Sequence, residues 1–147
     1  MITITEKRGS IITAPDKDRR TLVLLTNSTM TSSSSNYRDY ISRYPFTKEE
    51  LDTIKKTGAN DAILLNPEIA PYKRVVILKI DKKAGEFGCK NTINRMFDLL
   101  AYYSLFDLMM PRLGNECEMS WDLFKNSLLK DPNTKKYDFD IIVYYPR

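Results

Sequence analysis

The fold is decided by the stretch Phe106-Asp107-Leu108-Met109-Met110-Pro111-Arg112-Leu113-Gly114. It predicts a short apolar strand that stops at Pro111, which cannot donate a hydrogen bond to a sheet, and a turn at Gly114, which takes positive φ easily. An acidic loop follows, and a helix is predicted to open at Ser120. Ligands of open α/β sheets bind beyond the carboxyl ends of strands, so this turn is the first candidate for a binding site.

Other apolar runs predict the rest of the sheet. Residues 21–26 form a continuous apolar run, as expected of a strand that is buried on both faces, and residues 74–80 form the strongest strand of the sequence. We predict further strands at residues 2–5, 61–65 and 139–145, and a short extended piece at residues 9–13.

Amphipathic segments lie between these strands. Thr47 and Glu50 form a capping box that opens a helix, and Gly58 is expected to end it. Further helices are predicted at about residues 91–104 and from Ser120, with residues 81–89 as a polar loop. The alternation predicts one domain, residues 1–147, with an α/β fold: a three-layer α/β/α sandwich with a mixed central sheet.

The composition excludes several classes of function. The 147 residues contain no histidine, so Ser-His-Asp and Cys-His nucleophile systems and His-ligated metal sites cannot be built. The sequence has no Gly-x-Gly-x-x-Gly motif and no cluster of metal ligands, so we predict neither a cofactor nor a metal. The net charge of +4 suits an anionic partner without indicating a nucleic-acid binder.

The sequence also predicts a cytoplasmic protein. No apolar run approaches the roughly 20 residues that cross a bilayer. The first residues alternate like a strand and lack the basic and apolar regions of a signal peptide. Cys89 and Cys117 fit a reducing compartment and are too few for a disulfide framework.

A run of four serines, Ser32 to Ser35, follows the buried strand at residues 21–26 and precedes an amphipathic segment that begins at Tyr37. Its place predicts a strand-to-helix loop that offers backbone N–H groups to a ligand. The same composition is also typical of a mobile linker. Both interpretations stay open at this level.

Several of these segments resemble a macrodomain, the fold that binds ADP-ribose. The turn at residues 110–114, with Trp121 downstream, resembles the Met-Pro-Arg-Ile-Gly turn and later tryptophan of the branch that hydrolyses terminal ADP-ribose from acidic side chains. Weaker likenesses to that fold and branch lie at residues 7–11, 22–28, 82–83 and 89–92. The resemblance implies a protein that binds ADP-ribose or a related nucleotide derivative.

The resemblance also implies a set of site residues. Lys90 matches the branch's lysine that forms a covalent adduct at the anomeric carbon, and Glu116 or Glu118 is the candidate for its carboxylate. A deprotonated lysine beside a carboxylate suits that chemistry. The implied ligand-binding residues are Ser10, Asn27, Thr31, Ser32, Ser33, Ser34, Ser35, Gly114 and Asn115. The loops at residues 27–35, 82–90 and 114–118 are expected to converge on one cleft.

Three departures from the branch weaken the implied activity. Ser10 stands at the position of the family's adenine-binding aspartate, and residues 31–35 replace a glycine-rich loop with side chains that favour negative φ. The segment that carries Glu116 and Glu118 is one residue shorter than the branch's. We therefore expect any enzyme activity, which would be that of an ADP-ribosyl hydrolase, to be weak or absent.

The alternative function is a macrodomain-like scaffold that has lost this ligand. Such a scaffold would bind a macromolecular partner, either protein or nucleic acid, or another small ligand, and nothing in the sequence indicates a membrane. The loop at residues 31–35 discriminates between the two. A cradle of backbone N–H groups would favour the nucleotide binder, and a loop packed by its own side chains would favour the scaffold.

Overall fold

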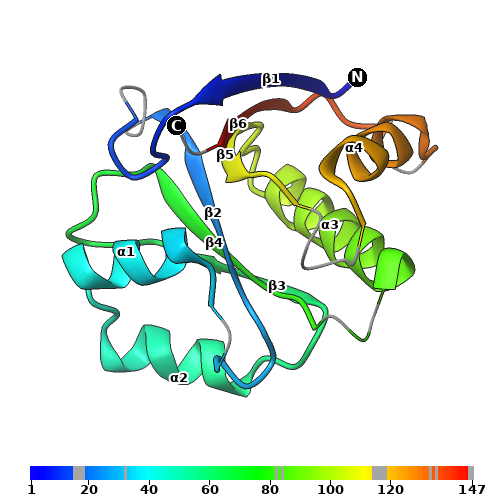
Figure 1. Cartoon of the computed structure of the whole chain (residues 1–147). Coiled ribbons are helices and arrows are strands. Elements are labelled where there is room, and N and C mark those ends of the chain that lie inside the picture. Colours follow the sequence, from blue (N-terminus) through cyan, green and yellow to red (C-terminus); the bar gives the residue numbers. More distant parts are fainter. Residues whose placement is uncertain are drawn as a thin grey trace.

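The computed structural model describes residues 1–14, 19–31, 33–81, 83, 85–113, 119–132, 134 and 136–145. They form one six-stranded sheet with a pair of helices on each face (Figure 1). The strands are β1 (Thr3–Arg8), β2 (Thr21–Thr26), β3 (Asp61–Leu65), β4 (Arg74–Lys79), β5 (Asp107–Pro111) and β6 (Asp140–Tyr145). The helices are α1 (Ser35–Arg43), α2 (Lys48–Lys56), α3 (Gly85–Tyr102) and α4 (Trp121–Lys130).

The strand order is β1-β6-β5-β2-β4-β3, and every neighbouring pair is parallel except β3 and β4. This is the predicted mixed sheet inside an α/β/α sandwich. The prediction that residues 74–80 form an interior strand is also confirmed, since β4 lies between β2 and β3. Only β1 and β3 are edge strands, and β1 carries mostly exposed residues.

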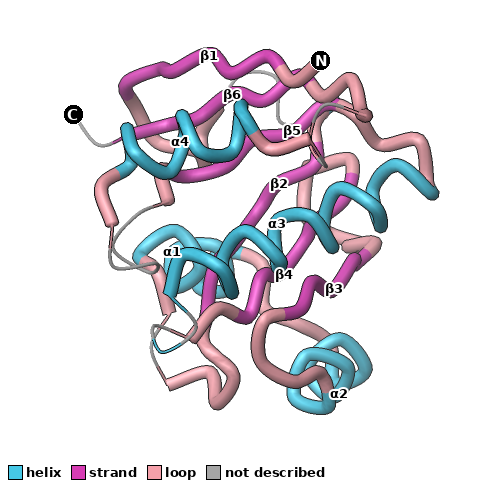
Figure 2. The backbone as a smooth tube through the Cα atoms, turned by 90° about the vertical axis from the view of Figure 1, so that its right-hand side faces the viewer, coloured by secondary structure: helices cyan, strands magenta, loops and turns pink. Residues whose placement is uncertain are grey.

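The core has two layers because side chains alternate across each buried strand. In β2, Leu22 and Leu24 pack with α1 and α2, whereas Val23 and Leu25 pack with α3 and α4. Figure 2, in which the right-hand side of Figure 1 faces the viewer, shows α3 and α4 in front of the sheet, both on the same face. All six residues of β2 are buried, as the continuous apolar run predicted.

Two elements differ from the prediction. Helix α3 begins at Gly85, although residues 81–89 were expected to form a loop, and Gly85 has φ of +62° just at that start. Gly88 and Cys89 are buried in α3, so packing on the sheet overrides the poor helix propensity of glycine. Residues 9–13 contain turns and bends rather than a strand.

The end of α2 lies where it was predicted, because Gly58 is the residue that follows the C-cap. The helix closes at the C-cap Thr57, and Gly58 does not take the left-handed conformation of a glycine cap. Instead the Nζ of Lys79, a fully buried residue of β4, donates hydrogen bonds to the carbonyl oxygens of Ile54 at 2.5 Å and Thr57 at 2.7 Å. Burial lowers the pKa of Lys79, while these C-terminal carbonyls supply the negative pole that its ammonium faces.

Two expectations drawn from the composition can be compared with the structure. Among the described residues, no helix combines the length and the apolar character needed to span a bilayer. Cys89 is fully buried and is disulfide-bonded, whereas the cysteine content alone had fitted a reducing compartment. Cys117 lies outside the described residues.

Candidate functional site

The carboxyl ends of the parallel strands meet at one edge of the sheet, and two connections there bind each other. β2 is followed by a loop at residues 27–34, here called the serine loop, and β4 is followed by Asp81 and the start of α3. Asp81 accepts hydrogen bonds from the backbone N–H and the hydroxyl of Ser28, each at 2.9 Å. This contact joins the loop after β2 to the residue just before the second of the three segments expected to converge, while the third, residues 114–118, lies outside the described residues, so their convergence on one cleft stays a prediction.

The serine loop is held by its own polar side chains. Asn27 accepts a hydrogen bond from the Thr31 N–H at 2.9 Å and donates to the Thr31 hydroxyl at 3.1 Å. The hydroxyls of Thr26 and Ser33 lie 2.8 Å apart. Met30 takes φ of +61°, a conformation that costs a residue with a side chain some strain, so the loop is not freely extended.

The loop ends in a well-formed helix start. Ser34 is the N-cap of α1, and its hydroxyl accepts a hydrogen bond from the Tyr37 N–H at 3.2 Å. The Ser34 N–H in turn donates to Leu25 in β2 at 3.1 Å, which fixes the helix start against the sheet. Ser35 is the first residue of α1 and is exposed. Serines that looked like either a linker or a binding loop thus form a capped strand-to-helix connection.

Two other predicted site residues lie in different surroundings. Ser10 is exposed in the turn after β1, where its hydroxyl accepts a hydrogen bond from the Ile12 N–H at 3.2 Å. Lys90 lies in the second turn of α3, and its Nζ is 3.7 Å from the Oδ2 of Asp131, the C-cap of α4. The remaining predicted residues, Ser32, Gly114, Asn115, Glu116 and Glu118, lie outside the described residues.

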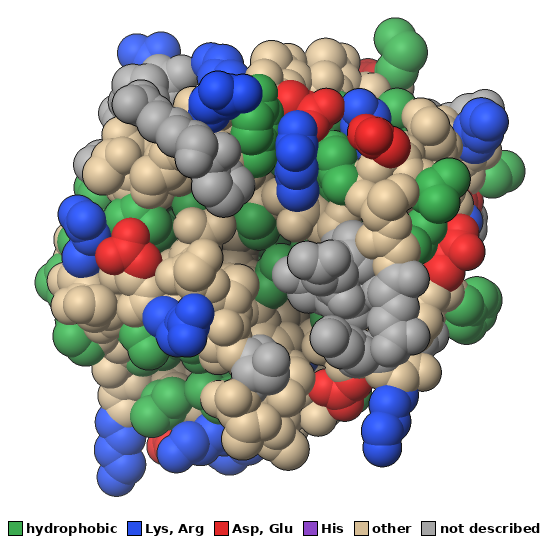
Figure 3. All heavy atoms as spheres, viewed as in Figure 1, with side chains coloured by type: hydrophobic (Ala, Val, Ile, Leu, Met, Phe, Trp, Pro, Cys, Tyr) green, Lys and Arg blue, Asp and Glu red, His purple; other side chains and the backbone are tan. Residues whose placement is uncertain are grey.

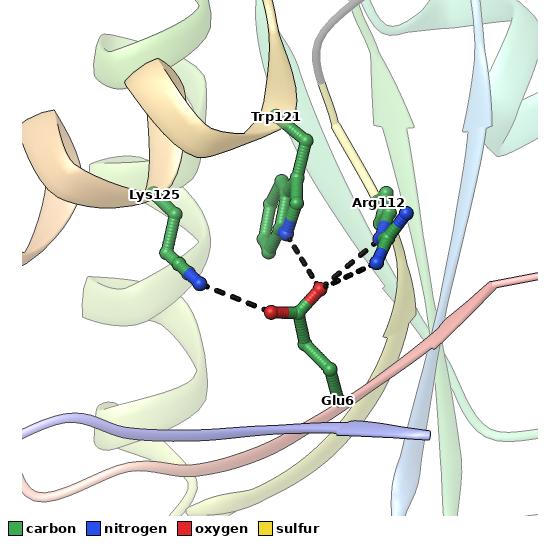
Figure 4. Close-up of polar contacts among 4 residues, drawn as sticks. All are labelled: Glu6, Arg112, Trp121 and Lys125. Carbon is green, nitrogen blue, oxygen red and sulfur yellow. Dashed lines mark hydrogen bonds and ion pairs between the residues drawn. The ribbon is translucent and has the colours of Figure 1, made fainter. Parts of the chain in front are cut away.

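The turn around which the sequence is organised is anchored on a residue that the sequence did not single out, Glu6 in β1 (Figure 4). The Nε of Arg112 donates a hydrogen bond to the Oε1 of Glu6 at 3.1 Å, and the Nη2 of Arg112 forms an ion pair with the same oxygen at 3.0 Å. The indole N–H of Trp121 donates to the same oxygen at 2.9 Å, and Lys125 reaches Oε2 at 3.0 Å. Arg112 and Trp121, which flank residues 114–118, are therefore fixed on one carboxylate.

The surroundings of Glu6 favour its charged form. The hydrogen bond from Lys125, aided by those from Trp121 and Arg112, lowers the pKa of Glu6 against the opposing effect of burial. Arg112 also crosses β6, with its guanidinium 4.0 Å from the centre of the Tyr145 ring. With one carboxylate facing two cations, the cluster keeps a small positive charge at this end of the sheet.

A signal for Glu6 was present in the sequence. Ile2, just before β1, and Ile4 and Glu6 within it alternate with outward residues, so all three lie on the face covered by α3 and α4. An acidic residue on that face requires a partner. Asp81 had no such signal, because its partner Ser28 is 53 residues away and its role depends on which strands are neighbours.

Comparison with solved structures identifies the architecture. The macrodomain of Mycobacterium tuberculosis DarG matches over 99% of both chains, with a TM-score of 0.75 and 15% sequence identity. The chain has the macrodomain fold. The macrodomain of Thermus aquaticus DarG matches at a TM-score of 0.68 and 12% identity, covering 99% of this chain and 100% of that one. A variant of the Oceanobacillus iheyensis macrodomain with ADPR matches at 0.71 and 9% identity, covering 96% and 83%.

Sequence comparison finds much less. No family model matches the chain, and no curated protein sequence matches it. The resemblance seen in the turn at residues 110–114 is thus confirmed at the level of the fold, at identities where the fold alone is shared. What the protein binds has to be argued from its own residues.

Proposed function

We propose that the protein binds ADP-ribose or a related nucleotide derivative at the carboxyl edge of its sheet. The proposal depends on the position of the serine loop. Two hydrogen bonds from Ser28 to Asp81 fix this loop, and it leads into the N-terminus of α1. The macrodomain fold supports the choice of ligand, since a solved macrodomain of similar fold is described with ADPR.

The chemistry of this edge suits a diphosphate. The first-turn N–H groups of a helix have no partner within the helix, and together with the helix dipole they favour an anion. In α1 the N-cap hydroxyl satisfies the Tyr37 N–H, and the amides of Ser35 and Asn36, which bond to no other described residue, can serve a ligand. No acidic residue lies in the first turn of α1, so nothing there competes with a phosphate for those amides.

Titration calorimetry with ADP-ribose tests the proposal. We expect ADP-ribose and ADP to bind and adenosine, which lacks the diphosphate, to bind at least tenfold more weakly, as charge-assisted hydrogen bonds to the phosphates imply. Asp81→Asn should weaken ADP-ribose binding about fivefold because it loosens the loop. The matched control is Asp52→Asn, which removes a charge from an exposed position of α2 and should leave affinity unchanged.

A specific observation favours a second function, the scaffold without this ligand. The amides of Ser28, Met30, Thr31 and Ser34 all donate to acceptors inside the protein, so these four amides are not left as an open cradle for a ligand. Absence of heat with ADP-ribose, ADP and adenosine at millimolar concentrations would contradict nucleotide binding and favour this scaffold.

We further propose that any glycohydrolase activity passes through Lys90, with Glu116 or Glu118 as the carboxylate. Lys90 is engaged in an ion pair with Asp131 and must leave it before its amine can act as a nucleophile. This pairing adds to the serines in the loop as a reason for weak turnover. Release of ADP-ribose from a glutamate-modified protein is the measurement.

In that assay the wild-type protein should be weak or inactive, and Lys90→Ala should abolish whatever turnover remains while costing ADP-ribose binding far less. The control is Lys83→Ala, which removes an exposed lysine from the same connection between β4 and α3. Robust wild-type turnover would contradict the expectation of weak activity. Equal turnover by Lys90→Ala would remove this lysine from the mechanism.

A further inference from the structure

A cavity of about 480 Å³ lies on the side of the sheet covered by α1 and α2. It is bounded by the serine loop, by α1 and by the beginning of α2. Its volume falls in the range of small-molecule sites, which is roughly 300–1,000 Å³. The residues that line it are Met30, Thr31, Ser33, Tyr37, Arg38, Ile41, Phe46 and Leu51.

The walls of this cavity, here called the α1–α2 cavity, are largely apolar and aromatic. The rings of Tyr37 and Phe46 meet edge to face, with centroids 5.8 Å apart, and Ile41 and Leu51 add aliphatic surface. Such walls favour a flat, apolar ligand body, because aromatic rings pack on one another in offset or edge-to-face geometry. Thr31 and Ser33 bring hydroxyl groups from the serine loop.

Among the described residues that line the cavity, only Arg38 is charged. Its guanidinium has no acidic partner among the described residues, while the acid next to it in sequence, Asp39, pairs with Arg43 at 3.3 Å. Figure 3, seen from the same side as Figure 1, shows Lys and Arg side chains around the α1 and α2 part of this face, with hydrophobic side chains between them. An unpaired guanidinium beside an apolar cavity attracts an anion that carries an apolar body.

Tyr37 supplies a second, independent feature. It is only 3% exposed and lines the cavity. A tyrosine carries a polar hydroxyl at the end of an apolar ring, so a ligand that packs against the ring can also form a hydrogen bond with the hydroxyl. Burial raises the pKa of Tyr37, so the phenol stays protonated and able to donate.

We propose that the α1–α2 cavity binds a small aromatic carboxylate. The ring would lie against Tyr37 and Phe46, and the carboxylate would pair with Arg38 and accept a hydrogen bond from the Tyr37 hydroxyl. A monoanion matches the single cation, whereas a phosphate dianion would be left half-neutralised. This inference does not rest on nucleotide binding at the carboxyl edge.

The test is an amide NMR titration of the ¹⁵N-labelled protein with 2-naphthoate. Shifts should concentrate on the amides of Thr31, Ser33, Arg38 and Leu51. Arg38→Gln, which removes the charge but keeps a polar side chain at this exposed position, should weaken 2-naphthoate about tenfold, the loss expected for one charge-assisted hydrogen bond. Arg43→Gln removes a charge one turn away on the same helix, outside the cavity, and should change affinity less than twofold.

Two further measurements make the outcome decisive. The neutral 2-naphthamide should bind the wild type about tenfold more weakly than 2-naphthoate and should bind Arg38→Gln and the wild type equally. Tyr37→Phe, which removes only the hydroxyl, should weaken 2-naphthoate a fewfold. Absence of shifts at the cavity, or equal affinity of Arg38→Gln and wild type for 2-naphthoate, would overturn the proposal. Displacement of 2-naphthoate by ADP-ribose would also overturn it, because both would then occupy one site.

Discussion

The loop after β2 and the turn after β5 begin at the same edge of the sheet, but they are stabilised by opposite kinds of contact. The serine loop after β2 is held by neutral, short-range hydrogen bonds between Thr31 and Asn27 and between Ser33 and Thr26, and the charged Asp81 anchors it through Ser28. The turn after β5 is held at both ends, through Arg112 and Trp121, by the distant carboxylate of Glu6.

This difference indicates where adaptability resides. Neutral hydrogen bonds contribute about 1 kcal/mol each, whereas those to a charged group contribute roughly twice as much. The serine loop can therefore exchange its internal bonds for bonds to a ligand at little cost. The Glu6 cluster is better suited to hold α4 and the flanks of residues 114–118 in one position. Each prediction below tests one side of this contrast.

The largest effect is expected for Glu6→Gln. The amide loses the charge that faces Arg112 and Lys125, and it can satisfy at most part of the hydrogen bonds that Glu6 accepts. Unfolding free energy should fall by about 2 kcal/mol at neutral pH, which lowers Tm by about 6 °C in a chain of this size. Calorimetry measures it, with Glu86→Gln as a control that removes one exposed carboxylate bonded to a single hydroxyl. Equal Tm shifts for the two variants would refute the anchoring role.

The effect of pH on the stability difference between the wild type and Glu6→Gln should be nearly as large. The pKa of Glu6 in the folded protein is lowered from its ordinary value of 4.5, chiefly by the hydrogen bond from Lys125. A lowered pKa means that the stabilisation is present above 4.5 and is lost as pH falls through the folded value. The stability gap between wild type and Glu6→Gln should stay constant from about pH 7 to 5.5 and narrow below 4.5. Urea unfolding at a series of pH values measures it; a gap that is unchanged at about pH 3 would show that the charge of Glu6 contributes nothing.

An intermediate effect is expected for Asp81→Asn. Ser28 loses one of its two hydrogen bonds to a charged carboxylate, so unfolding free energy should fall by about 1.5 kcal/mol. Because the loop itself is held by neutral bonds, its amides should lose protection from hydrogen exchange more than those of α4 do. Exchange measured by NMR separates the two regions. An equal loss of protection in the serine loop and in α4 would mean that the loop after β2 and the turn after β5 are not stabilised independently.

The sequence predicted the parts of the molecule that depend on local pattern. Continuous apolar runs identified β2 and β4, and the Thr47–Glu50 capping box is present with both of its hydrogen bonds. The prediction failed where contacts between residues far apart in the sequence determine the structure. α3 starts earlier than its glycines suggest because Cys89 packs into the core, and α2 is capped by Lys79 from a strand that follows it in the chain.

The candidate site shows the same division. The place of the serine loop between β2 and α1 was predicted, because a buried strand followed by an amphipathic segment requires a connection there. Its partner Asp81 and the Glu6 cluster depend on strand order, which periodicity does not specify. The roles of Lys90, Glu116 and Glu118 remain predictions, and Lys90 additionally forms an ion pair with Asp131 that no local pattern indicated.

The smallest effect is expected at Ser34, and it tests whether the serine loop is more than a connection. Ser34→Ala removes the hydroxyl that accepts from the Tyr37 N–H, which should cost about 1 kcal/mol of unfolding free energy, while Ser34→Gly should cost only a few tenths. Chemical unfolding of both variants measures this. If the loop serves only to cap α1, the affinity for ADP-ribose should change little in either variant. If the loop contacts the ligand, Ser34→Gly should alter affinity more than stability, because glycine frees the backbone just where the first-turn amides of α1 begin.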